Sequence, residues 1–218
     1  MVDTADSKSA SARSGGSSPS WGTKINKFMM TNIRHMHYKK LNLPIELIPY
    51  DYGVVDLPDR FVEIKMELDH INKEVHDFLD SIGVEITMPR YFHSGPPHVY
   101  NLHVDVTPWP NQYTRLNWIF GGDGSQMIWY KLQPGKTPSM IKNSVGEELL
   151  TFDIDDCIEI ERAHIAGPNL VNVGKIHNLT GGTQERHCYS FFLKDKKSKS
   201  RMEWNQAIDR FRPFLGEA

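Results

Sequence analysis

Short segments that alternate apolar and polar residues run from about residue 88 to residue 193, with turns rich in glycine, proline and asparagine between them. Alternation with a period of two places successive side chains on opposite faces of a β-strand. Many short strands separated by turn residues are typical of an all-β sandwich or barrel. The pattern therefore predicts a mainly β core over about residues 88–193.

Two amphipathic segments flank this β region. In the first, apolar residues step by three and four positions, which predicts a helix over about residues 59–82 with one face packed on the sheet. Asp59 is placed to cap its start and Gly83 to end it. The second pattern predicts a C-terminal helix over about residues 200–211.

The domain organisation follows from composition along the chain. Residues 1–20 contain seven serines and no apolar pattern, which predicts a disordered tail. The chain has 218 residues, of which 39% are hydrophobic, so residues 21–218 can bury the core of one domain. We expect a single domain there.

Charge, hydropathy and cysteine content exclude several classes of protein. A net charge of −2 provides no strong attraction to nucleic acid or to an anionic membrane. No apolar run has the length of a transmembrane helix, and no signal-peptide pattern is visible at the start. Cys157 and Cys188 are too few for a secreted disulfide framework. We therefore expect a cytoplasmic protein.

Two segments 74 residues apart carry the residue types of a metal site. Alternation puts Asn101, His103 and Asp105 on one face of a predicted strand, and His177 ends a second apolar segment. Two histidines and one carboxylate are the set that holds a non-haem ferrous ion while leaving positions open for oxygen chemistry. A half-buried strand with a solvated polar face is the alternative for the first segment taken alone.

The second segment favours the metal-site interpretation over the half-buried strand. Residues 169–179 predict a strand in which Gly174 allows a kink or a close approach, and residues 186–193 predict its hairpin partner. Arg186, Cys188 and Ser190 fall on one face of that partner, so the guanidinium could anchor an anionic co-substrate.

Three other histidines receive non-ligand interpretations. His187 falls on the opposite face from Arg186, with the aromatic residues, and is expected to be a packing or surface residue. His93 is expected in a loop, and His98 in a structural role.

The chain resembles the Fe(II)/2-oxoglutarate-dependent oxygenase superfamily over roughly residues 90–195, most closely its small bacterial and phage-type members. The motifs are His103-Val-Asp105, Arg115-Leu-Asn117, Trp129-Tyr130, Val173-Gly-Lys-Ile-His177 and Arg186-His-Cys-Tyr-Ser190. The resemblance implies a double-stranded β-helix (jelly-roll, cupin-like) core and iron held by His103, Asp105 and His177. It also implies that Arg186 binds the far carboxylate of 2-oxoglutarate. Many members carry a hydroxyl residue two positions after this arginine, where this chain has Cys188, so either Ser190 or Cys188 could assist it.

The implied activity is that of an Fe(II)- and 2-oxoglutarate-dependent dioxygenase using O2, with ascorbate as a supporting reductant and no catalytic residue beyond the metal ligands. Hydroxylation of a small molecule or a protein side chain is the expected reaction, and desaturation and cyclisation stay open, as does the oligomeric state. A cupin-type metalloenzyme that needs no 2-oxoglutarate and a non-catalytic jelly-roll binding module are the alternatives. Residues that could line the mouth of the site, and could equally belong to the core or the rim, are Tyr100, Trp109, Arg115, Trp118 and Trp129.

Overall fold

A computed structural model describes residues 37–52, 61–96, 99–105, 108–143 and 146–216. All of them belong to one compact unit, residues 34–218. The predicted disordered tail and the predicted cap Asp59 lie outside the described residues.

The described elements are mostly strands. They are β1 (Tyr38–Lys40), β2 (Phe61–Lys65), β3 (Val84–Ser94), β4 (Leu102–Val104), β5 (Thr114–Gly121), β6 (Gln126–Leu132), β7 (Ser139–Lys142), β8 (Glu148–Phe152), β9 (Cys157–Ala163), β10 (Gly167–Asn172), β11 (Ile176–Thr180) and β12 (Arg186–Asp195). The helices are α2 (Lys73–Ser81) and α3 (Trp204–Phe211), with short 3-10 turns η2 (Leu68–His70), η3 (Ile154–Asp156) and η4 (Arg212–Phe214). No described helix has both the length and the apolar character needed to cross a membrane.

The strands form two antiparallel six-stranded sheets. The first has the order β1-β10-β5-β12-β3-β2 and the second β7-β8-β4-β11-β6-β9. From β4 to β6 and again from β10 to β12, consecutive strands alternate between the two sheets. This confirms the mainly β, double-stranded β-helix fold expected from the sequence.

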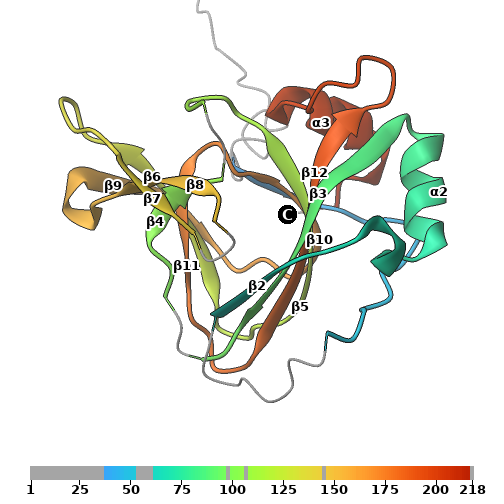
Figure 1. Ribbon diagram of the computed structural model, residues 1–218, viewed down its shortest axis with the longest axis horizontal. Helices are drawn as coiled ribbons and strands as arrows, with labels where there is room; N and C mark the ends of the chain where they lie inside the picture. The colour runs from blue at the N-terminus through green and yellow to red at the C-terminus, as the bar shows by residue number, and fades with distance from the viewer. Residues whose placement is uncertain (1–36, 53–60, 97–98, 106–107, 144–145, 217–218) are drawn as a thin grey trace, which may run out of the picture. The chain divides into compact units, whose positions relative to one another are not determined.

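Apolar side chains fill both sides of the first sheet. Between the sheets, Val171 and Phe192 of the first meet Met127 and Trp129 of the second in one buried cluster. On the outer side of the first sheet, a second cluster joins strand residues to the apolar faces of α2 and α3. In Figure 1 both helices lie on the side of this sheet that faces away from the second sheet. The inner and outer faces of the first sheet therefore have separate environments.

The predicted helix over residues 59–82 is wrong in its first half. Residues 61–65 form β2, which pairs antiparallel with β3, and the helix begins only after Asn72. Its end is as predicted, because Gly83 has a φ of +70° and its N–H donates to the carbonyl of Asp80. Apolar residues at 61, 62 and 64 suit a strand as well as a helix, and the free edge of β3 decides between them.

The predicted hairpin between residues 169–179 and 186–193 is also wrong. The first segment is two strands, β10 and β11, which lie in different sheets. β11 pairs with β4 and β6, whereas β12 pairs with β3 and β5. Gly174 lies at the crossover, where a Cβ would come within 1.9 Å of the backbone oxygen of Asn111, so the predicted close approach is present.

Candidate metal centre

His103 and His177 face each other across two neighbouring strands. They are direct partners in the antiparallel pairing of β4 with β11, and their ring centroids are 4.5 Å apart. Directly opposite residues of an antiparallel pair project from the same face of a sheet. Strand pairing thus brings together two histidines that are 74 positions apart in the sequence.

Backbone carbonyl groups hold both imidazole rings in one tautomer. Nδ1 of His103 lies 2.8 Å from the carbonyl oxygen of Asn101, and Nδ1 of His177 lies 2.8 Å from that of Lys175. A carbonyl oxygen only accepts, so Nδ1 must carry the proton and donate it. This leaves Nε2 of each ring as the nitrogen that can bind a metal, the arrangement found in ligating histidines.

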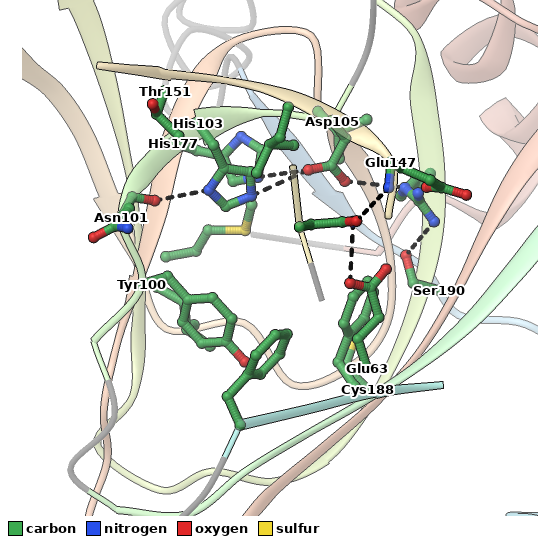
Figure 2. Close-up of a pocket in the computed structure, with 18 of the residues that line it drawn as sticks. Glu63, Tyr100, Asn101, His103, Asp105, Glu147, Thr151, His177, Cys188 and Ser190 are labelled. Atoms are coloured by element: carbon green, nitrogen blue, oxygen red, sulfur yellow. Dashed lines mark hydrogen bonds and ion pairs between the residues drawn. The ribbon is translucent and has the colours of Figure 1, made fainter. Parts of the chain in front are cut away.

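Asp105 supplies the carboxylate between the two rings. It follows β4 directly, and its backbone N–H donates to the carbonyl of Val173, next to the crossover. Its Oδ1 lies 3.1 Å from Nε2 of His103 and 3.7 Å from Nε2 of His177 (Figure 2). These three residues form a group that could hold a metal ion, with all three ligand atoms within 4.8 Å of one another.

Two of the three groups, Asp105 and His177, have protonation states that suit metal binding. Burial by itself would raise the pKa of Asp105, but the hydrogen bond from His103 and the charge of Arg115 hold this pKa well below its usual range. Burial, reinforced by neighbouring His103, lowers the pKa of His177 to about 4. Burial would also lower the pKa of His103, but the hydrogen bond and the charge of Asp105, together with the carbonyl of Asn101, outweigh burial and raise that pKa, so His103 must release a proton when it binds a metal. At neutral pH the site thus holds a carboxylate and a neutral His177.

Arg115 is the counter-ion of Asp105. It comes from β5 in the opposite sheet, and its Nε lies 3.0 Å from Oδ2 of Asp105. The guanidinium lies over the ring of Phe192 at 3.9 Å, and Nη1 donates to the hydroxyl of Ser190 at 3.3 Å. That hydroxyl in turn donates to Oδ1 of Asn117 at 2.6 Å. Arg115 therefore orients the carboxylate through Oδ2, the oxygen that is not the one nearest the histidines. Ser190 belongs to the hydrogen-bond network of Arg115.

Arg186 reaches the same cavity from the start of β12. It is 6% exposed, and its Nε has no hydrogen-bond partner. Among the described residues, no carboxylate forms an ion pair with it. Gly122 makes room for its stem: a Cβ there would lie 2.8 Å from Cγ of Arg186, at a φ of +75° that favours glycine. The described part of the chain thus buries this guanidinium without supplying a carboxylate counter-ion.

One cavity of about 490 Å³ contains all of these side chains. Figure 2 shows His103, His177 and Asp105 on one side of it and Glu63 and Cys188 on another. The residues that line it are Phe61, Glu63, Phe92, Val99, Tyr100, Asn101, His103, Asp105, Arg115, Asn117, Met127, Ile141, Asn143, Glu147, Glu148, Leu149, Thr151, Val173, His177, Leu179, Arg186, Cys188 and Ser190. All five residues predicted as metal or co-substrate ligands therefore share one cavity.

The other sequence expectations for the site have mixed outcomes. Tyr100 and Arg115 line the cavity, whereas Trp109, Trp118 and Trp129 pack in apolar clusters outside its lining. Burial raises the pKa of the Cys188 thiol, against the nearby charges of Arg186 and Arg115, so this group next to Arg186 is a neutral thiol.

The structure contradicts one of the histidine interpretations. The loop placement of His93 is wrong, because this residue lies in β3 and is 1% exposed. His98 lies outside the described residues.

A cluster of charged side chains next to the cavity was not predicted from the sequence. Arg90 of β3 pairs with Glu147, which precedes β8, and its Nε lies 3.5 Å from a carboxylate oxygen of Glu63 in β2. Burial raises the pKa of Glu63, with Arg90 opposing the shift. The three residues come from three separate strands or loops, and no local pattern joins them. Their only sequence signal is a charged residue inside an apolar alternation.

Comparisons with known proteins are sparse. No model of a known protein family matches the chain, and no curated protein matches it. Among solved structures, an oxidoreductase of the 2OG-Fe(II) oxygenase family from Burkholderia pseudomallei is 14% identical, with a TM-score of 0.32 over 54% of this chain and 48% of that one. E. coli ycfD is 16% identical, with a TM-score of 0.30 over 57% of this chain and 28% of that one. The chain spans less than half the length of either protein, and likenesses at these scores carry no argument about its activity.

Proposed function

We propose that this protein is a non-haem Fe(II)- and 2-oxoglutarate-dependent dioxygenase that hydroxylates its substrate. His103, Asp105 and His177 hold the iron, and Arg186 binds the far carboxylate of 2-oxoglutarate. The observation that carries the proposal is the combination in one cavity of this His-Asp-His group with a buried guanidinium that pairs with no carboxylate among the described residues.

The residues fit the metal that the proposal requires. Each imidazole donates Nδ1–H to a carbonyl and turns Nε2 toward Asp105, which is the orientation a metal ligand needs. Two imidazoles and a carboxylate on one side of an ion leave positions for other ligands. When bound, iron with 2-oxoglutarate would supply the oxidising chemistry, in which 2-oxoglutarate, O2 and the substrate become succinate, CO2 and the hydroxylated substrate, with one oxygen atom of O2 in succinate and the other in the hydroxylated substrate.

The protein contributes binding, orientation and exclusion of water. Arg115 keeps the Asp105 carboxylate ionised and turned toward the histidines. Arg186 neutralises an anion inside a largely buried cavity, where a charged hydrogen bond is stronger than in water. The apolar wall that includes Phe92, Leu179 and Met127 limits the water that reaches the site.

Arg186 favours this proposal over the two alternatives. A buried guanidinium without a carboxylate partner costs free energy, which a bound anion would offset. A cupin-type metalloenzyme that needs no 2-oxoglutarate would use such a cation only for an anionic substrate. A non-catalytic module that binds metal or a small anion would need either the His-Asp-His group or the guanidinium, but not both in one cavity.

Anaerobic titration with Fe(II) and 2-oxoglutarate tests the proposal. Ferrous iron that is chelated by the 2-oxo acid end of 2-oxoglutarate has a weak visible charge-transfer band. We expect this band only when Fe(II) and 2-oxoglutarate are both present. His103→Gln should remove the band because it removes a ligand. Arg186→Ala should preserve the band at saturating 2-oxoglutarate but require at least about ten times more of it, since a charged hydrogen bond is worth about 1.5–3 kcal/mol.

Surface substitutions provide matched controls. Arg162→Ala removes an exposed arginine that pairs with Glu159, and His164→Gln removes a histidine outside the cavity. Both should behave as the wild type. No band in the wild type with Fe(II) bound would favour the cupin alternative, and no Fe(II) binding would favour the non-catalytic module.

A further inference from the structure

We propose that the protein has a second metal site, in which His93, Glu185 and His187 bind a zinc-like divalent ion on the outer face of the first sheet. Like the first group, these three residues present one ligand atom each within 4.8 Å of one another. Their donor set, two imidazoles and one carboxylate, suits Zn²⁺. The site is independent of the proposed oxygenase activity.

Strand pairing positions the two histidines. His187 of β12 is the direct partner of His93 of β3, so both project from the same face, and their ring centroids are 5.1 Å apart. Glu185 precedes β12 and reaches toward both rings. Its Oε2 lies 3.7 Å from Nε2 of His93 and 3.8 Å from Nε2 of His187.

These separations are those of ligands rather than of hydrogen-bonded partners. Both exceed the distance at which a nitrogen and an oxygen share a hydrogen bond. Zinc bonds of about 2.1 Å in a tetrahedron place ligand atoms about 3.4 Å apart. A shift of a few tenths of an ångström at the Glu185 carboxylate, which is 41% exposed, would close the site around an ion.

Burial and hydrogen bonding supply a second reason to expect a ligand. His93 is 1% exposed, and its Nδ1 has no hydrogen-bond partner. A ring enclosed to this degree normally satisfies its polar atoms. Nδ1 of His187 lies 2.7 Å from the hydroxyl of Tyr91, which can accept its proton and leave Nε2 turned toward Glu185. A metal ion at the two Nε2 atoms would give the buried His93 ring a strong polar contact through Nε2, while Nδ1 would still have no partner among the described residues.

The site has its own access to solvent. Glu185 and His187 line a separate cavity of about 420 Å³ whose other walls are mainly tyrosine side chains, among them Tyr91 and Tyr189. Arg186, between them in the sequence, points to the opposite face and lines the first cavity. The first sheet therefore separates the two groups, and each can be emptied or filled without the other.

An ion at this position would join β3 to β12. It would bind His93 on one strand and both Glu185 and His187 at the beginning of the other, on either side of Arg186 in the sequence. Binding to the folded protein alone stabilises it by mass action. The ion would thus raise the melting temperature.

Titration with Co²⁺ as a spectroscopic substitute for Zn²⁺ tests the site. We expect two ions per wild-type chain and one in His103→Gln, which disables the first group. In that background the remaining ion should show the intense visible absorption of low-coordinate Co²⁺ and be displaced by Zn²⁺. Each of the substitutions Glu185→Gln and His187→Gln should lower the affinity for this ion at least about a hundredfold. The loss of an outer-shell partner alone lowers metal affinity by about 10–100-fold, and these substitutions remove a ligand.

Controls separate metal loss from misfolding. Glu185 is partly exposed, so Glu185→Gln should keep the circular dichroism spectrum and metal-free melting temperature of its parent, while losing the rise that Zn²⁺ produces. His164→Gln, on an exposed histidine of neither group, should bind as many ions as its parent. No Co²⁺ bound to His103→Gln, or unchanged binding in both Glu185→Gln and His187→Gln, would overturn the proposal. A single ion in the wild type that His103→Gln retains would count against the first site instead.

Discussion

Asp105→Asn tests the two roles that the structure gives this residue, as a predicted metal ligand and as the counter-ion of Arg115. The carboxylate and the guanidinium are 3.0 Å apart and both largely buried. At an effective dielectric constant near 20, two charges at that distance attract by roughly 5.5 kcal/mol. Breaking a buried pair by removing one partner costs about 3–5 kcal/mol. Asparagine still accepts a hydrogen bond, so we expect the metal-free protein to lose about 3 kcal/mol of its free energy of unfolding.

The pH dependence of this loss has a definite sign. Folding depresses the pKa of Asp105, so the carboxylate stabilises the protein at any pH above its unfolded pKa of about 3.9. That stabilisation disappears as the pH falls toward the folded pKa and the wild-type carboxyl becomes protonated. The contribution of the ionised carboxylate should therefore be fully present at about pH 5 and above and shrink below about pH 4. Because Asp105 also raises the pKa of His103, the difference between wild type and Asp105→Asn should grow as the pH falls from about 7 to 5, before it shrinks.

Urea unfolding in the presence of a chelator, followed by tryptophan fluorescence, measures the effect. A loss of about 3 kcal/mol corresponds to a fall in melting temperature of roughly 6–12 °C for a domain of this size. Asp123→Asn, at an exposed acid, is the matched control and should change little. The double variant with Arg115→Leu should recover part of the loss, because no charge then remains unpaired. Equal stability of Asp105→Asn and Asp123→Asn, or a loss independent of pH, would refute the role of the ion pair.

Four further results are expected. Ser190→Ala should weaken 2-oxoglutarate binding less than tenfold by calorimetry, since a neutral hydroxyl contributes only about 1 kcal/mol; a loss as large as that of Arg186→Ala would contradict this. Gly122→Ala should weaken that binding because its Cβ would meet Arg186, whereas Gly135→Ala, at a similar φ in open space, should not. Cys188, buried and with a raised pKa, should react with a thiol reagent at pH 8 only on unfolding, and labelling of the native thiol would argue against its burial. With Fe(II), ascorbate, 2-oxoglutarate and O2 but no substrate, the protein should slowly form succinate, and absence of both succinate and 2-oxoglutarate binding would remove the proposed activity.

The sequence by itself determined the features that depend on local backbone geometry. Side chains alternate along any strand, so the pattern around His103 was sufficient to place it on one face with a polar neighbour and to predict a mainly β core. The same alternation separated Arg186 from His187, and the structure finds them on opposite faces of β12. Gly83 and Gly174 were recognisable because few other residues suit a helix end or a close backbone approach.

Tertiary structure decided everything that depends on which strands become neighbours. The apolar residues of 61–65 suit a helix or a strand, and pairing with β3 selects the strand. Residues 169–179 cross from one sheet to the other, so β11 brings His177 to His103 while β12 brings His187 to His93. Pairings of this kind arise from hydrogen bonds and apolar burial between segments distant in the chain, which no local pattern encodes. For the same reason Arg115 becomes the counter-ion of Asp105 only when the two sheets have packed together.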